Sequence, residues 1–112
     1  MKLVKDGEGV PYEAKGHFNC WNIRKFLGGE ETVRMTVAMT HFLPNGGADM
    51  LASPTERVYV GISGALLAKS KDGEEFIIEP GDMLYIPPNE ERSVETIGTE
   101  PATIMVFMNK LD

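Results

Sequence analysis

The two histidines of the chain are the side chains best suited to exchange protons near neutral pH. His41 ends one face of an alternating run between Val33 and Leu43. A histidine there is usually a core residue with one satisfied nitrogen, but if it faces the interior of the fold it is the best general-base candidate. His17 lies in the polar stretch Lys15-Gly16-His17 and is expected at the surface or at the start of a strand.

Tyr59 and Tyr85 are the candidate acids, because each carries a hydroxyl that can donate a proton or orient a ligand. In small barrels a tyrosine more often fills space while its hydroxyl reaches one partner, and this alternative stays open for both residues. The larger apolar side chains are expected to pack in the core or to line a pocket: Trp21, Met35, Met39, Met83 and Met105.

The segments that must position these side chains are short apolar or alternating runs. We expect strands at about residues 18–26, 33–43, 57–67, 75–78, 83–86, 92–97 and 102–108. Breaker sequences separate them, among them the segments 44–47, 71–74 and 79–82. No window shows a helical repeat, and the 12 glycines and 7 prolines punctuate the whole chain. This spacing favours an all-β sandwich or barrel.

The length and net charge of the chain limit the number of domains and the kinds of partner that we expect. A chain of 112 residues suits one domain. The net charge of −6, without a basic cluster, argues against nucleic-acid and membrane-surface partners. The single cysteine, Cys20, excludes an internal disulfide, and the first ten residues lack the apolar core of a signal peptide. We therefore expect a soluble cytoplasmic protein.

Two stretches resemble the paired signature of the cupin family. The first family motif, G-x5-H-x-H-x3-E-x6-G, is matched at its end by Pro54-Thr55-Glu56-Arg57-Val58-Tyr59-Val60-Gly61-Ile62-Ser63-Gly64. The second, G-x5-P-x-G-x2-H-x3-N, resembles Gly81-Asp82 followed by Ile86-Pro87-Pro88-Asn89. The resemblance covers about residues 33–108, with a further strand region at about 10–30. It implies a cupin jelly-roll β-barrel over a single domain, 1–112, with its site inside the barrel and a homodimeric assembly.

The residues at the family's metal-ligand positions depart from the pattern. The two histidines of the first motif fall on Leu51 and Ser53, and its glutamate falls on Arg57. The histidine of the second motif falls on Arg92, and its asparagine on Thr96. Divalent metals need imidazole or carboxylate donors, whereas leucine offers none and a protonated guanidinium repels the cation. We therefore expect neither a metal nor another cofactor.

A second register keeps a carboxylate at the glutamate position. It aligns Glu56 with the family glutamate and Asp49 with the first histidine, but it displaces the closing glycine by one residue. A relocated metal site that uses these two carboxylates, or His17 and His41, is the alternative that the sequence leaves open.

The two arginines suggest a different ligand. Two guanidinium groups ~4 Å apart repel by about 4 kcal/mol at an effective dielectric constant of about 20, so an anion should lie between them. A bound carboxylate or phosphate would satisfy Arg57 and Arg92. Salt bridges to the neighbouring acids would do so equally well: Glu56, Glu91 and Glu95.

Patterning and resemblance disagree about where Arg57 points. Patterning places the apolar face of Val58, Val60 and Ile62 inward and Arg57 outward. The resemblance to cupins reverses this orientation. Following the resemblance, we predict that Leu51, Ser53, Arg57 and Arg92 bind a small carboxylate in a barrel without metal. The alternatives are an isomerase or epimerase that uses His41 with Tyr59 or Tyr85, and a dioxygenase-like cupin with relocated metal ligands.

Overall fold

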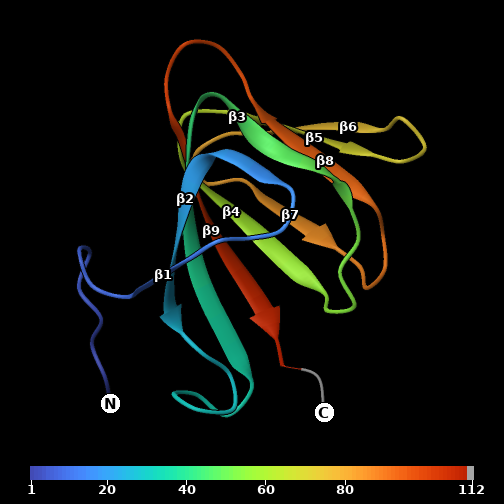
Figure 1. Cartoon of the computed structure of the whole chain (residues 1–112). Helices are drawn as coiled ribbons and strands as arrows, with labels where there is room; N and C mark the ends of the chain where they lie inside the picture. Colours follow the sequence, from blue (N-terminus) through green and yellow to red (C-terminus); the bar gives the residue numbers. More distant parts are fainter. Residues whose placement is uncertain (111–112) are drawn as a thin grey trace.

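The computed structural model describes residues 1–110, and these residues form strands without any helix (Figure 1). No helix in that part of the chain therefore has the length and apolarity needed to cross a membrane. The strands are β1 (Val10–Tyr12), β2 (His17–Phe26), β3 (Met35–Leu51), β4 (Arg57–Ser63), β5 (Leu66–Ser70), β6 (Glu75–Ile78), β7 (Met83–Ile86), β8 (Arg92–Thr96) and β9 (Ala102–Asn109).

One long strand, β3, belongs to both walls of the fold. The hydrogen-bonded order is β6-β5-β8-β3-β9-β4-β7, and β2 joins β3 on a second path that ends with β1. The first half of β3 pairs with β2 and β9, while its second half pairs with β8 and the start of β2. The sheet therefore folds over at β3 into a nearly closed antiparallel barrel (Figure 1). This confirms the predicted all-β barrel.

We expected the breaker sequence at residues 44–47 to end the strand. In the structure it bends β3, which continues to Leu51. Asn45 takes a positive φ of 65°. A Cβ atom on Gly46 would lie 2.3 Å from the carbonyl oxygen of Asn19, and one on Gly47 would lie 2.3 Å from that of Val94. Because only glycine allows so close an approach of neighbouring backbones, the two glycines make a corner between the walls.

The predicted strand at residues 57–67 is two strands. Gly64 takes a φ of 68°, which other residues rarely adopt, and the chain turns there between β4 and β5. The strands predicted at 75–78 and 83–86 are observed with the same bounds. The short β1 lies within the predicted strand region at about 10–30 but was not predicted as a separate strand.

The larger wall, β2-β3-β9-β4-β7, packs the core with one face and lies on the outside of the barrel with the other. Its inner face packs the core, which includes Phe42, Tyr59, Ala102, Ile104 and Val106. The other side, called the outer face below, carries one row of cross-strand neighbours: Ile23, Met39, Met105, Val60 and Met83. Met83 is 72% exposed, so the expectation that it packs in the core is wrong. Trp21 is 54% exposed and lines a surface cavity beside β2, which fits the pocket-lining alternative.

Candidate functional site

Two connected cavities occupy the interior of the barrel. The first, the entrance cavity, measures about 230 Å³, and several exposed residues such as Lys15 and Asp49 lie at its rim. The second, the inner cavity, measures about 200 Å³ and is bounded by buried core residues such as Phe42 and Ile104. Five residues line both cavities: Ala14, His17, Arg57, Tyr59 and Val94.

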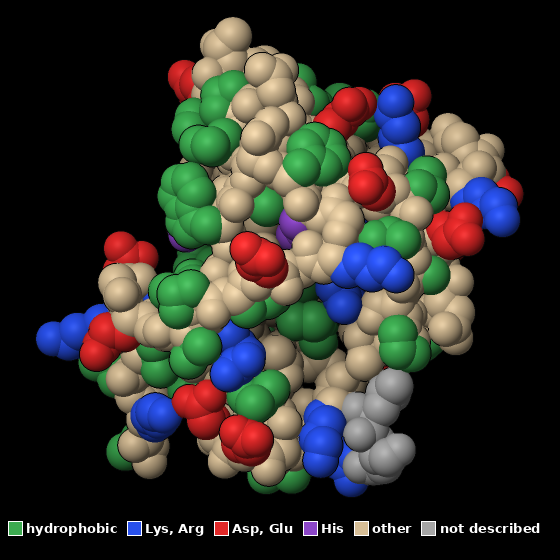
Figure 2. All heavy atoms as spheres, viewed as in Figure 1, with side chains coloured by type: hydrophobic (Ala, Val, Ile, Leu, Met, Phe, Trp, Pro, Cys, Tyr) green, Lys and Arg blue, Asp and Glu red, His purple; other side chains and the backbone are tan. Residues whose placement is uncertain are grey.

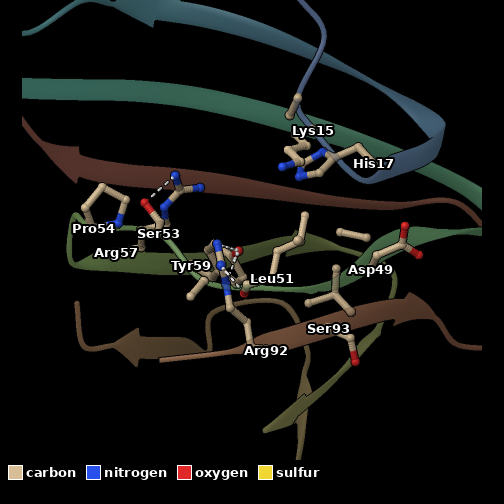
Figure 3. Close-up of a pocket in the computed structure, with 14 residues that line it drawn as sticks. Lys15, His17, Asp49, Leu51, Ser53, Pro54, Arg57, Tyr59, Arg92 and Ser93 are labelled. Atoms are coloured by element: carbon tan, nitrogen blue, oxygen red, sulfur yellow. Dashed lines mark hydrogen bonds between the residues drawn. The ribbon is translucent and has the colours of Figure 1, made fainter. Parts of the chain in front are cut away.

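The four predicted ligand-binding residues all line the entrance cavity. Leu51 ends β3, Arg57 begins β4, Arg92 begins β8, and Ser53 lies in the connection between β3 and β4. Figure 3 shows Arg57 and Arg92 on different strands, both directed toward the cavity. Residues separated by up to 41 positions are thus brought together by the closure of the barrel.

Arg92 is fixed by hydrogen bonds to β3, its neighbour in the sheet, and to β4 on the other wall. Its Nη1 donates to the backbone oxygen of Leu51 at 2.7 Å. Its Nε and Nη2 both donate to the hydroxyl oxygen of Tyr59, at 3.3 and 3.1 Å. Since the Tyr59 oxygen accepts two hydrogen bonds, its own proton remains available to a third group.

Arg57 is bonded on one side only. Its Nη2 donates to the Oγ of Ser53 at 3.0 Å, while its Nε is buried without a hydrogen-bond partner. Burial lowers the pKa of Arg57, the Tyr59 hydroxyl opposes that shift, and the nearby guanidinium of Arg92 adds to it. Neither arginine takes part in a salt bridge within residues 1–110. The cavity therefore holds guanidinium donors that the chain itself leaves unmatched.

His17 begins β2, pairs with Ala48 of β3 and lines both cavities (Figure 3). Burial lowers the pKa of His17, its side-chain interaction with Asn22 opposes that shift, and the charges of Arg57 and Arg92 add to it. The resulting pKa lies below the ordinary value of 6.5, which favours the neutral imidazole at pH 7. Its Nδ1 is buried without a hydrogen-bond partner. The expected strand start is confirmed. That the side chain reaches the interior could not be predicted, because its neighbours in sequence are polar.

The inner cavity contains two more polar side chains that sequence reasoning missed, Tyr12 and Arg24. The Nε of Arg24 is also buried without a hydrogen-bond partner. The pKa of Tyr12 is raised by burial, against the opposing effect of Arg57 and Arg24. Both residues come from strands ahead of the motif-bearing segment, so the family motifs gave no reason to consider them.

His41 and Tyr85 line neither the entrance cavity nor the inner cavity, although Tyr85 and Arg92 both line a smaller cavity of about 80 Å³. The expectation that the two residues share the interior site with Arg57 is therefore corrected. His41 stacks on Trp21 with ring centroids 5.4 Å apart, and its Nδ1 is 2.9 Å from the hydroxyl of Thr103. Tyr85 is 55% exposed and donates to Glu56 at 3.0 Å. Successive side chains of a strand point to opposite faces. His41 and Tyr85 point outward because side chains next to them in sequence, such as Phe42 and Ile86, are buried.

The residues at the family's metal-ligand positions do not fit a metal ion. Leu51 has no donor atom, and the guanidinium groups of Arg57 and Arg92 remain cationic. Within residues 1–110 no group of three or more His, Cys, Asp or Glu side chains is placed to bind a metal. Glu56, the carboxylate of the alternative register, instead bonds to Tyr85 and Asn109.

The cavities are cationic in an acidic chain. Four basic residues line them, namely Lys15, Arg24, Arg57 and Arg92. Within residues 1–110 the acidic lining residue is Asp49, whose side chain is exposed at the rim. Figure 2 shows the surface hollowed near its centre, with Lys or Arg side chains beside the hollow. An anion is therefore the ligand that this interior would attract.

The nearly closed barrel with a cavity between its two walls defines the fold class. The family is identified from the sequence. Residues 38–108 match the family model of the Cupin domain. The chain belongs to the cupin family, and its fold is the all-β cupin jelly roll.

Similar proteins carry several different names. The chain is 28% identical over 109 residues to Beta-D-galactosidase Rv1717 of Mycobacterium tuberculosis, which covers 95% of this chain and 91% of that protein. The structure of the polyketide cyclase RemF from Streptomyces resistomycificus superimposes with a TM-score of 0.85 at 17% identity, over 97% of this chain and 79% of the cyclase. A cupin-like protein from Thermotoga maritima gives 0.80 at 14% identity, over 92% and 78%. The two structures share the fold.

Proposed function

We propose that this cupin binds a small organic anion of the carboxylate type inside its barrel, without a metal. The observation that carries the proposal is Arg57, whose Nε is buried in the cavity without a partner while its Nη2 is held by Ser53. A buried donor without an acceptor costs free energy, and a carboxylate would accept from it with a charge-assisted hydrogen bond. Arg92, fixed by Leu51 and Tyr59, adds a second positive charge on the same cavity.

The fold alone does not select the reaction or the ligand, because one fold serves many functions. The proposal therefore rests on the cavity and not on the names of the similar proteins. It includes a cytoplasmic location, for which the support is the lone Cys20 and the absence of a disulfide pattern.

Calorimetric titration with a series of straight-chain carboxylates tests the proposal. The wild-type chain should bind at least one member, and Arg57→Gln should weaken that binding by about tenfold or more, since a charged hydrogen bond is lost. Lys71→Gln is the matched control, because it removes one positive charge from an exposed pair with Glu91. No binding by the wild-type chain, or equal loss in both variants, would contradict the proposal.

Proton transfer is the second candidate function, and His17 is the observation that favours it. With His41 on the outer side, the base would be the neutral His17 imidazole and the acid the Tyr59 hydroxyl, both of which line the two cavities. The test is deuterium incorporation from D2O next to the carboxylate of the acid that binds, followed by NMR. Incorporation that His17→Gln abolishes would support an enzyme, whereas binding without incorporation would leave a binding protein.

A further inference from the structure

Arg24 is the cation of the cavity that the proposed function does not use. It pairs across β2 and β3 with Ala38, which is fully buried on the inner face, so Arg24 points to the interior. Its guanidinium lines the inner cavity, and its Nε is buried without a hydrogen-bond partner. Two arginines, Arg24 and Arg57, therefore carry unmatched donors into one space.

Tyr12 shows that these two guanidinium groups lie within reach of one small molecule. The electrostatic effects of both Arg57 and Arg24 act on the Tyr12 hydroxyl. All three side chains line the inner cavity, whose volume is about 200 Å³. A ligand that fills this cavity would contact both arginines at once.

The positive charges that line the inner cavity favour a ligand with more than one negative group. The described lining of the inner cavity contains no acidic residue. Glu31 interacts electrostatically with Arg24 from outside that lining, but its carboxylate pairs with Lys2 at 2.8 Å. A single carboxylate that pairs with Arg57 would therefore leave the buried Nε of Arg24 without an acceptor. Apolar side chains line the same cavity, beside the hydroxyl groups of its tyrosines and threonines: Phe42, Ile104, Val106 and Met108. These apolar side chains suit a short hydrocarbon segment.

We propose that the ligand is a dicarboxylate with a short apolar chain, one carboxylate bound by Arg57 near the entrance and the other by Arg24 in the inner cavity. This inference rests on the proposed anion binding and deepens it. Arg24 is then the residue that distinguishes a diacid from a monoacid, because it is the cation that only the second carboxylate reaches.

The experiment compares each straight-chain dicarboxylate from malonate to adipate with its own monomethyl ester by calorimetry. The ester keeps the length of the molecule and removes one charge. For the tightest-binding member, the wild-type chain should bind the diacid about tenfold or more tightly than the ester. Arg24→Gln should remove this preference by weakening the diacid more than the ester, while Arg57→Gln should weaken both ligands.

Two further variants keep the test interpretable. Arg24→Lys retains the charge and should retain part of the preference, and Lys71→Gln should retain all of it; circular dichroism checks that each variant is folded. Equal affinity of diacid and ester for the wild-type chain, or an equal loss of both in Arg24→Gln, would overturn the dicarboxylate inference and leave anion binding standing. Failure of every diacid and every ester to bind the wild-type chain would instead overturn the proposed function.

Discussion

Arg92 and Tyr59 are joined by two hydrogen bonds, from Nε and Nη2 of the arginine to the single hydroxyl oxygen of the tyrosine. Tyr59 is 6% exposed and lies on the inner face of β4, while Arg92 begins β8 on the other wall. The pair therefore links the two walls of the barrel at the cavity, at the position where metal-binding cupins would be expected to place an ion.

Tyr59→Phe should destabilise the chain, because it removes the acceptor of both bonds and keeps the ring. Hydrogen bonds to charged groups contribute about 1.5–3 kcal/mol, so we expect a loss of that order in the free energy of unfolding. Urea denaturation measures it. Tyr85→Phe is the matched control, since its hydroxyl bonds to Glu56 at the surface, and it should cost much less. Equal effects in the two variants would contradict this assignment.

A second buried pair ties β2 to β3. The hydroxyl of Thr40 donates to Oδ1 of Asn22 at 2.7 Å, and both residues are almost fully buried. Thr40→Val keeps the shape and leaves the Asn22 oxygen without its donor, which should cost about 1–3 kcal/mol of unfolding free energy. The double variant with Asn22→Leu should cost less than the sum of the single variants in a double-mutant cycle. Strict additivity would show that the pair does not interact.

The pKa of His17 predicts a pH dependence of stability. Its folded value is lowered below the ordinary value of 6.5, so the unfolded chain binds the proton first as the pH falls. The stability contributed by the neutral imidazole is therefore full above pH 6.5 and is lost as the pH falls from 6.5 to the folded pKa. His17→Gln should lose less stability over that range in urea denaturation. Parallel pH profiles of the variant and the wild-type chain would contradict the shift.

The outer face predicts association of two copies, and we propose that it forms a homodimer interface. Five strands at a spacing of about 4.8 Å give a face about 24 Å wide. Large apolar patches on a protein surface mark sites of interaction with other proteins. The row of Ile23, Met39, Met105, Val60 and Met83 is uncharged in a chain of net charge −6. Two acidic copies would therefore approach with least repulsion through this face.

Light scattering after size exclusion tests the dimer. Met83→Glu places a charge in the row, on the exposed edge strand β7, and should give a monomer. Met50→Glu makes the same substitution at another exposed methionine outside that row and should leave the dimer intact. A monomeric wild-type chain, or a dimer unaffected by Met83→Glu, would contradict the proposal.

Sequence reasoning succeeded where a local pattern decides the structure. Turn residues located the β6 and β7 strands, and the motif spacing brought Leu51, Ser53, Arg57 and Arg92 to one cavity. It failed where both faces of a strand are apolar. His41 shares its face with methionines and was assigned to the apolar side, but in this barrel that side is the outer one.

The residues that sequence reasoning missed share a different cause. His17, Tyr12 and Arg24 reach the interior through a β-bulge near Asn19 and through pairing between strands distant in sequence. Neither the bulge nor the register leaves a mark on hydrophobic periodicity. Only the assembled barrel shows that these polar side chains turn inward.

Strand β3 connects the outer face directly to the cavity. This strand carries Met39 on the outer face, turns at Gly46 and Gly47, and ends with Leu51, whose carbonyl holds Arg92. A dimer contact and a bound ligand would thus act on two ends of one continuous backbone, with no flexible loop between them to absorb a displacement. Occupancy of the cavity and pairing of the copies are therefore expected to be thermodynamically coupled.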